Sequence, residues 1–275
     1  MGRTTTEAER IGLVAGNGRF PLLFAAAARA EGVHVVAVAH RGETSEDLVA
    51  LVDELTWVRV GELGKLIRAL RRAGVRRAVM AGGIGKPRHL SDIRPDLRGA
   101  AFLAKTRSLK DDVLLRGVAA ELERDGIEVV ESTLFLGRLV PRLGTLSRRE
   151  PRASEWEDIR FGLQVAKDIG RWDIGQSVVV KRGTVLAVEG IEGTDAAVRR
   201  GGELGRGDVI VVKVSKPNQD LRFDVPAVGP TTIAVMREVG AVALALEAGR
   251  TIMLDRDELL AAADAAGIAV VAVEV

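Results

Sequence analysis

IGLVAGNGRFP, at residues 11–21, begins with a short apolar run of the kind found in buried strands. The glycines that follow permit a tight turn, and Pro21 suits the first turn of a helix. Strand, glycine-rich turn and helix form the start of a βαβ unit. Strand-like runs at residues 33–39 and 77–81 continue this alternation, as do helical patterns at 61–73 and 110–125. The sequence predicts a doubly wound, mostly parallel, Rossmann-like sheet.

The pattern changes in the second half of the chain. Residues 137–154 contain two prolines, two glycines and a basic run, so they are the best candidate for the linker between two domains. We place an N-terminal Rossmann-like α/β domain at residues 1–145 and a C-terminal mixed α/β domain at residues 146–275. The second domain holds a hairpin at residues 177–189 and a short helix near residues 196–199, which Thr194 or Asp195 caps. We expect two α/β lobes, the second a mixed sheet with helices, and a ligand cleft between them.

Composition excludes several classes of protein. The chain has no Cys, so disulfides, thiolate catalysis and Cys-ligated metals are excluded. Its three His residues show no metal-binding spacing. A net charge of +2 and 3% aromatic residues argue against a nucleic-acid partner. The N-terminus lacks the apolar core of a signal peptide, and no apolar run reaches the roughly 18 residues of a membrane span. We therefore expect a cytoplasmic protein.

Two glycine turns end strands of the first sheet. Gly16-Asn17-Gly18 follows the first strand, and Gly82-Gly83 follows the strand at residues 77–81. Carboxyl ends of parallel strands meet at one sheet edge, where open α/β sheets bind ligands. Gly16, Asn17 and Gly83 are candidate ligand contacts, with plain turn chemistry as the alternative. The third glycine and the acidic residue of a dinucleotide fingerprint are absent, which argues against NAD.

Residues 105–112, KTRSLKDD, place cations beside two carboxylates at a helix start. Lys110 and Asp111 are candidates for contact with a phosphate and its cation. The alternative is structural, because carboxylates in a first helical turn complement the helix dipole.

Residues 213–232, KVSKPNQDLRFDVPAVGPTT, carry too many functional groups for a simple connection. Three prolines make the segment a shaped loop. If residues 220–224 are extended, Asp220, Arg222 and Asp224 share one face. They then form either an ion-pair ladder or a site in which a carboxylate holds Mg²⁺ and the cations hold phosphate oxygens. Spacing alone leaves Asp220 and Asp224 equal candidates for the metal ligand.

The chain resembles the LpxI family, the UDP-2,3-diacylglucosamine pyrophosphatases of lipid A biosynthesis. The motifs that carry the resemblance run in the family's order from about residue 11 to the C-terminus: IGLVAGNGRFP, the VMAGG turn, KDD, VLAVEGIEGTDA and VKVSKPNQDLRFDVPAVGPTTI. The resemblance implies hydrolysis of the diphosphate of UDP-2,3-diacylglucosamine to UMP and 2,3-diacylglucosamine 1-phosphate (lipid X), with Mg²⁺ or another divalent cation. It also implies a location on the cytoplasmic face of the inner membrane, and it leaves open whether the chain forms a homodimer.

The resemblance singles out Asp224 as the essential aspartate, either as metal ligand or as the group that orients water. It implies diphosphate and sugar contacts from the same motif and from the GTD turn: Lys213, Lys216, Gln219, Asp220, Arg222 and Asp195. A non-catalytic two-lobe sensor of a nucleotide-sugar or phospholipid is the alternative function. A nucleotide-dependent oxidoreductase is a weaker third.

Overall fold

The computed structural model describes residues 9–85, 95–106 and 111–275, with the side chains of residues 111 and 112 left out. The chain divides into two compact units. The first comprises Met1–Leu136 together with Asp220–Asp224, and the second comprises Gly137–Gln219 and Val225–Val275. A short piece of the second half of the sequence therefore belongs to the first unit.

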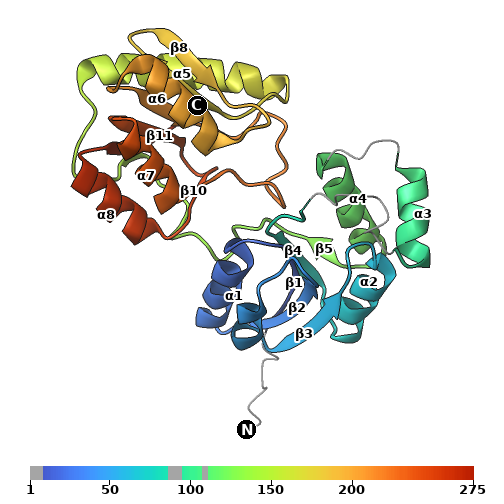
Figure 1. Ribbon diagram of the computed structural model, residues 1–275. Helices are drawn as coiled ribbons and strands as arrows, with labels where there is room; N and C mark the ends of the chain where they lie inside the picture. Colours follow the sequence, from blue (N-terminus) through green and yellow to red (C-terminus); the bar gives the residue numbers. More distant parts are fainter. Residues whose placement is uncertain (1–8, 86–94, 107–110) are drawn as a thin grey trace. The chain divides into compact units, whose positions relative to one another are not determined.

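The sheet of the first unit is entirely parallel, which confirms the Rossmann-like prediction. Its order is β3-β2-β1-β4-β5 (Figure 1). The strands are β1 (Arg10–Ala15), β2 (His34–His40), β3 (Glu54–Val58), β4 (Arg77–Ala81) and β5 (Glu128–Val129). Both faces are apolar because both are covered by helices. Leu13 belongs to the cluster around helix α1 (Phe20–Ala30), whereas Val14 belongs to the cluster with α2 (Leu63–Arg72) and α4 (Asp111–Arg124).

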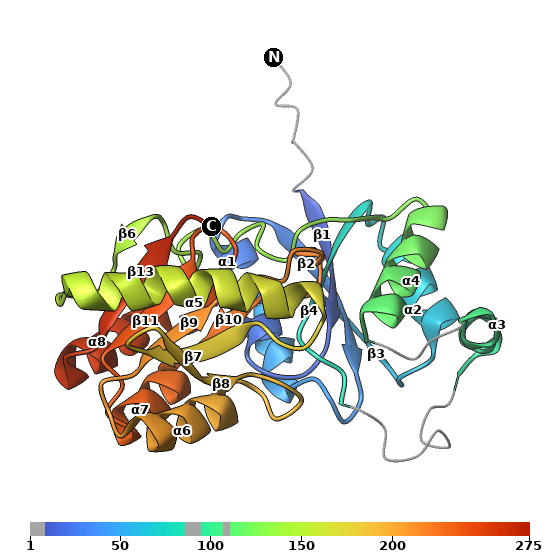
Figure 2. The same cartoon turned by 90° about the horizontal axis from the view of Figure 1, so that it is seen from above.

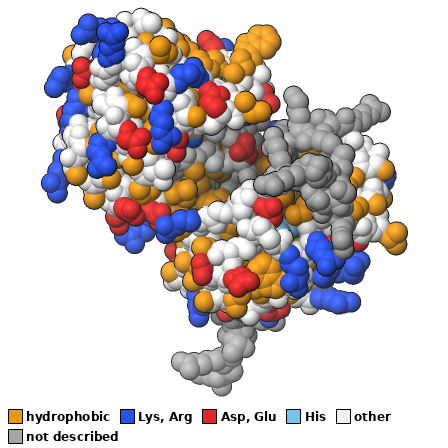
Figure 3. Space-filling model, viewed as in Figure 1, with side chains coloured by type: hydrophobic (Ala, Val, Ile, Leu, Met, Phe, Trp, Pro, Cys, Tyr) orange, Lys and Arg blue, Asp and Glu red, His pale blue; other side chains and the backbone are white. Residues whose placement is uncertain are grey.

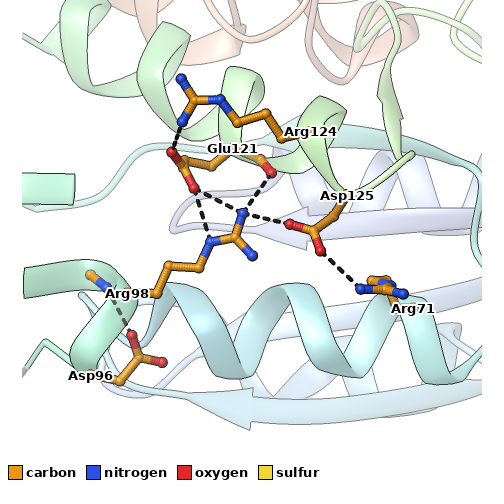
Figure 4. A network of polar contacts seen from close by, with 7 residues as sticks. Arg71, Asp96, Arg98, Glu121, Arg124 and Asp125 are labelled. Atoms are coloured by element: carbon orange, nitrogen blue, oxygen red, sulfur yellow. Dashed lines mark hydrogen bonds and ion pairs between the residues drawn. The ribbon is translucent and has the colours of Figure 1, made fainter. Parts of the chain in front are cut away.

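A charged network joins three helices of this unit (Figure 4). Arg98 of α3 (Leu97–Lys105) binds Glu121 and Asp125 at the end of α4, and Asp125 also accepts from Arg71 of α2 at 3.0 Å. The sequence patterns did not predict α3 or the 3-10 helix η1 (Glu46–Leu51). Helix α3 is short, and only Gly99 among its residues is buried.

The second unit contains a six-stranded mixed sheet of order β6-β13-β11-β9-β7-β8, as predicted. Its strands are β6 (Gly144–Thr145), β7 (Ser177–Lys181), β8 (Thr184–Val188), β9 (Ile210–Lys213), β11 (Ala243–Glu247) and β13 (Ala269–Val273). Strands β9, β11 and β13 are parallel, and β6, β7 and β8 pair antiparallel. Helix α5 (Ala153–Arg171) covers one face (Figure 2), and α6 (Thr194–Gly205), α7 (Pro230–Glu238) and α8 (Arg256–Ala266) cover the other.

Helix α6 is much longer than the short helix expected near residues 196–199. Gly201 and Gly202 suggest a helix end in the sequence, yet α6 continues through them. A Cβ at Gly201 would lie 2.6 Å from Val179 Cβ, and one at Gly202 would lie 2.2 Å from Val239 Cβ. These glycines therefore let the helix pack closely and do not end it.

Residues 214–229 connect the second unit to the first and back again. Asp220–Asp224 belongs to the first unit, where Phe223 is 9% exposed and joins the core cluster on the α2 and α4 face. The returning chain forms β10 (Ala227–Val228), which pairs in parallel with β12 (Ile252–Met253). No local sequence pattern indicated this exchange.

No helix in the described part of the chain is long and apolar enough to cross a membrane. Basic and acidic side chains are interspersed over the face of the second unit that Figure 3 shows.

Candidate functional site

The two glycine turns of the first unit lie side by side at the carboxyl ends of β1 and β4. Gly16 N donates to Ala81 O at 2.8 Å, and Asn17 N donates to Gly83 O at 2.7 Å. A Cβ at Gly16 would lie 2.2 Å from Gly83 O, so no other residue fits without moving the backbone. Both turns share one sheet edge, as predicted. Ligand contact at Gly16, Asn17 and Gly83 stays a prediction.

Glu43 ties these turns together, and the sequence analysis missed it. Its Oε2 accepts from Asn17 Nδ2 and from Gly85 N, both at 2.8 Å. At the end of β2, His40 Nδ1 donates to Ala15 O at 2.8 Å. Burial lowers the pKa of the His40 imidazole despite that hydrogen bond and the nearby Glu43 charge. The side chains of Glu43 and His40 thus form hydrogen bonds that stabilise the turns at this edge.

The candidate cluster at residues 105–112 is only partly visible. Lys110 lies outside the described residues, as do the side chains of Asp111 and Asp112. Asp111 is the first residue of α4, in keeping with a helix start there.

Residues 220–224 form a turn and are not extended, so the shared-face geometry expected for Asp220, Arg222 and Asp224 is wrong. Asp224 N donates to Asp220 O at 3.0 Å. The turn still brings two of the three side chains together. Arg222 Nε and Nη2 donate to the two oxygens of Asp220 at 2.9 and 2.8 Å, and Arg222 Nη1 donates to Glu123 of α4 at 2.9 Å.

The two aspartates of this turn differ in their surroundings. Hydrogen bonds from Arg222 lower the pKa of the Asp220 carboxyl and occupy both its oxygens. Asp224 is exposed, and its carboxylate has no hydrogen bond or ion pair to any described residue. Asp224 is therefore the carboxylate of this turn that can accept a new partner.

No group of three or more His, Cys, Asp or Glu side chains within the described ranges could hold a metal ion. A preformed protein cage is therefore not found there. Mg²⁺ commonly binds through one or two carboxylates plus waters and substrate phosphates. The exposed carboxylate of Asp224 fits that kind of binding.

Lys213 stands at the carboxyl end of β9 in the second unit and is only 5% exposed. Its Nζ donates to Thr194 Oγ1 at 2.7 Å, and Thr194 Oγ1 donates to Glu189 Oε1 at 2.9 Å. Ser177, the neighbour of Lys213 across the sheet, lies 3.4 Å from the same hydroxyl. Lys213 was a predicted site residue, whereas Glu189 was not.

Asp195 and Thr194 do not cap α6, which corrects the sequence expectation. The N-cap is Gly193, with φ of 82° and no side-chain cap. Asp195 instead accepts from Thr232 Oγ1 of α7 at 3.0 Å. The Gly193 conformation starts the helix one residue early, and this frees Thr194 for Lys213.

Lys216 and Gln219 form a tight turn after β9. Gln219 Oε1 accepts from Lys216 N at 2.8 Å, and Lys216 Nζ donates to Asp173 at 2.6 Å. Gln219 Nε2 is buried and has no partner among the described residues.

A buried ion pair holds the start of this turn. Lys167 Nζ of α5 lies 2.8 Å from both oxygens of Glu247, at the end of β11, and 2.9 Å from Ser215 O. Glu247 Oε2 also accepts from Ser215 N at 2.7 Å and Ser215 Oγ at 2.8 Å. The pair thus fixes Ser215 through all its polar groups. Sequence reasoning missed it because the three residues are far apart in the chain.

Family models match both halves of the chain: the LpxI N-terminal domain matches residues 10–139, and the LpxI C-terminal domain matches residues 142–271. The UDP-2,3-diacylglucosamine pyrophosphatase LpxI of Caulobacter vibrioides is 36% identical over 278 residues. That match covers 96% of this chain and 98% of the relative.

Two solved structures are more distant. The biotin carboxylase subunit of pyruvate carboxylase is 15% identical, with a TM-score of 0.26, covering 74% of this chain and 44% of its own. The structure of gox2253 is 12% identical, with a TM-score of 0.29, covering 90% of this chain and 79% of its own. Likeness at this level carries no argument about function.

Proposed function

The chain belongs to the LpxI family, and we propose that it hydrolyses the diphosphate of UDP-2,3-diacylglucosamine. The products are UMP and 2,3-diacylglucosamine 1-phosphate, in a step of lipid A biosynthesis. Water adds to one phosphorus, the bond from that phosphorus to the bridging oxygen breaks, and the water gives up a proton. The observation that carries the proposal is the 36% identity to the UDP-2,3-diacylglucosamine pyrophosphatase of Caulobacter vibrioides, which extends over nearly the full length of both chains.

Asp224 is the proposed catalytic carboxylate. Support comes from its exposure and from the absence of any partner for its side chain in the described structure, while Asp220 is bound to Arg222. An uncommitted carboxylate can accept the proton of an attacking water or bind a cation. The Arg222–Asp220 pair and the packing of Phe223 hold the turn that presents it.

Mg²⁺, or another divalent cation, is the proposed cofactor, with Asp224 as its protein ligand. When bound, the cation would neutralise charge on the diphosphate. Side chains of the protein would donate the remaining hydrogen bonds to the substrate. Lys213, Lys216 and Gln219 from the second unit, with Arg222 from the first, are the proposed contacts for phosphate and sugar. Further proposed contacts with the substrate are Asn17, Gly83, Lys110 and Asp111 of the first unit and Asp195 of the second.

We also propose peripheral contact with the cytoplasmic face of the inner membrane, because the substrate carries two acyl chains. Trp172 and Ile174, just after α5, and Ile191, between β8 and α6, are exposed. Gly175 and Glu189 are in backbone contact, which brings these apolar side chains to the same part of the second unit. Sedimentation with anionic vesicles tests the contact; Trp172→Ser should reduce the bound fraction.

The central experiment measures UMP release from UDP-2,3-diacylglucosamine by the wild-type chain and by Asp224→Ala. Loss of a general base or its equivalent should lower kcat by about 10²- to 10⁴-fold. Stability should change little, because the side chain is exposed and has no hydrogen bond or ion pair to any described residue. Asp257→Ala, which removes an exposed carboxylate from α8, is the control and should keep full activity.

Three results would contradict the proposal or one part of it. Wild-type protein that binds the substrate and releases no UMP would favour a sensor. Full activity of Asp224→Ala would remove the assigned mechanism. Activity that persists in EDTA would remove the cation while leaving the reaction in place.

A further inference from the structure

Four buried side-chain atoms in the described part of the chain have no hydrogen-bond partner: Gln176 Oε1, Glu189 Oε2, Gln219 Nε2 and Thr251 Oγ1. All four belong to the second unit. Buried polar atoms are nearly always paired in folded proteins, so each exception calls for an explanation.

The topology places the four residues at one edge of the sheet. Gln219 and Thr251 follow the parallel strands β9 and β11 in the chain. Strand β7 is antiparallel to β9, and β8 is antiparallel to β7. Gln176, just before β7, and Glu189, just after β8, therefore lie at the end where β9 finishes. Ligands bind at the carboxyl ends of parallel strands in open α/β sheets.

Glu189 is the strongest acceptor of the four. It is only 9% exposed, and its Oε1 is already used by Thr194. Its Oε2 needs a donor, and a carboxylate repels a phosphate, so the group that fits is a neutral hydroxyl. Lys213 is linked to Glu189 through Thr194, which places a cation beside the hydroxyl acceptor.

The turn that follows Glu189 has little apolar packing. Glu189 is followed by Gly190, Ile191, Glu192 and Gly193, in which two glycines bound a turn whose Ile191 is fully exposed. Displacing this turn would break the Gly190 N to Glu192 hydrogen bond of 3.0 Å and the ion pair of Glu192 with Arg200 at 2.6 Å. It would break no apolar packing by Ile191, which is fully exposed.

We propose that this edge of the second unit binds a sugar, with Glu189 Oε2 accepting from a sugar hydroxyl and Gln219 Nε2 donating to a sugar oxygen. The inference rests on the proposed function, since the sugar is one of the two that the substrate carries: the ribose of the nucleotide or the glucosamine. Both offer hydroxyls, and the experiment separates them.

The test uses calorimetry with two soluble probes, UMP for the ribose and glucosamine 1-phosphate for the glucosamine. We expect the wild-type chain to bind one of them, and Glu189→Gln to raise its Kd about tenfold, because a hydrogen bond to a charged acceptor is replaced by a neutral one. Gln219→Glu keeps the acceptor for Lys216 N and removes the donor, so it should weaken the same probe. Glu203→Gln removes the charge of an exposed carboxylate near the other end of α6 and should leave the Kd unchanged.

Deoxy analogues identify the hydroxyl. Removing it from the probe should weaken binding to the wild-type chain and weaken binding to Glu189→Gln much less, because the interaction is already lost. Thermal unfolding of each variant verifies that it folds. If Glu189→Gln does not fold, the Gln219→Glu result and the deoxy analogues on the wild-type chain decide.

Three results would overturn the inference: no binding of either probe by the wild-type chain, equal effects of Glu189→Gln and Glu203→Gln, or deoxy analogues that bind as tightly as their parents. The last would mean that the unpaired atoms bind ordered water only. Because binding is measured without turnover, a chain that releases no UMP would refute the proposed function and leave this test intact.

Discussion

The carboxyl edges of the two sheets are built in opposite ways. In the first unit the edge is made of backbone: Gly16 N donates to Ala81 O, and Asn17 N donates to Gly83 O. Glu43 and His40 bond to main-chain or amide groups. In the second unit it is made of side chains, with Lys213, Glu189 and Glu247 buried at strand ends. The four unpaired buried atoms all lie in the second unit. The structure of the first edge thus depends on the close approach of two backbone turns. The structure of the second depends on buried charged side chains, which are stable only when they are paired.

The largest expected effect tests the second edge. Lys167→Met leaves Glu247 buried without its main cation, which should cost about 3–5 kcal/mol, toward the lower figure because Arg250 Nε lies 3.7 Å away. Replacing both Lys167 and Glu247 by apolar residues should recover most of this loss. Urea unfolding measures both.

Lys181→Met is the matched control, because Lys181 Nζ donates only to the carbonyls of Gly205 and Gly207 in the hydrogen bonds found for it. It should cost about 1 kcal/mol. Equal losses for the two lysine variants would mean that the Glu247 charge does not govern this edge.

Gly16→Ala tests the first edge. Its Cβ would lie 2.2 Å from Gly83 O, so the two turns must separate, at a cost of about 1–3 kcal/mol. Gly18→Ala meets nothing within 4 Å and pays only for φ of 81°, about 1 kcal/mol. Denaturant midpoints that rank Gly18→Ala as the more damaging change would contradict the close-approach argument.

Arg222→Lys tests the segment that joins the first unit. A lysine cannot bind both Asp220 oxygens and Glu123 as the guanidinium does. Because Arg222 is about one-third exposed, the loss of stability should be about 1 kcal/mol or less. Additivity of Arg222→Lys and Glu123→Gln in a double-mutant cycle would show that the pair is not coupled.

The smallest effect concerns pH. Burial depresses the folded-state pKa of His40 below about 6.5, the usual value for an unfolded chain. The unfolded chain then binds more protons than the folded one, so stability falls as pH drops below about 6.5 toward the folded pKa. Asn at residue 40 can still donate to Ala15 O. His40→Asn should therefore lose less stability over this range, and thermal unfolding at a series of pH values measures it; an unchanged pH profile would exclude His40 as the cause.

Local patterns predicted most of the regular structure. Strands β4 and β7 match their predicted residues, because buried apolar runs bounded by glycine or turn residues are unambiguous. The prediction of an extended segment at residues 220–224 was wrong. It was suggested by Asp, Arg and Asp at alternate positions, a spacing that is typical of one face of a strand. The conformation of these residues is set by Phe223 in a distant core and by Glu123, 99 residues away.

By itself, the sequence determined the two α/β lobes, the glycine turns at one sheet edge and the family motif that contains Asp224. These features depend on short-range periodicity and turn chemistry, which residues close together in the sequence determine. Only the tertiary structure showed that Asp220 is paired with Arg222, placed residues 220–224 in the first unit and joined Lys167, Ser215 and Glu247. Buried pairing of charges is a long-range property, since which carboxylate is left unpaired depends on every element that packs around it.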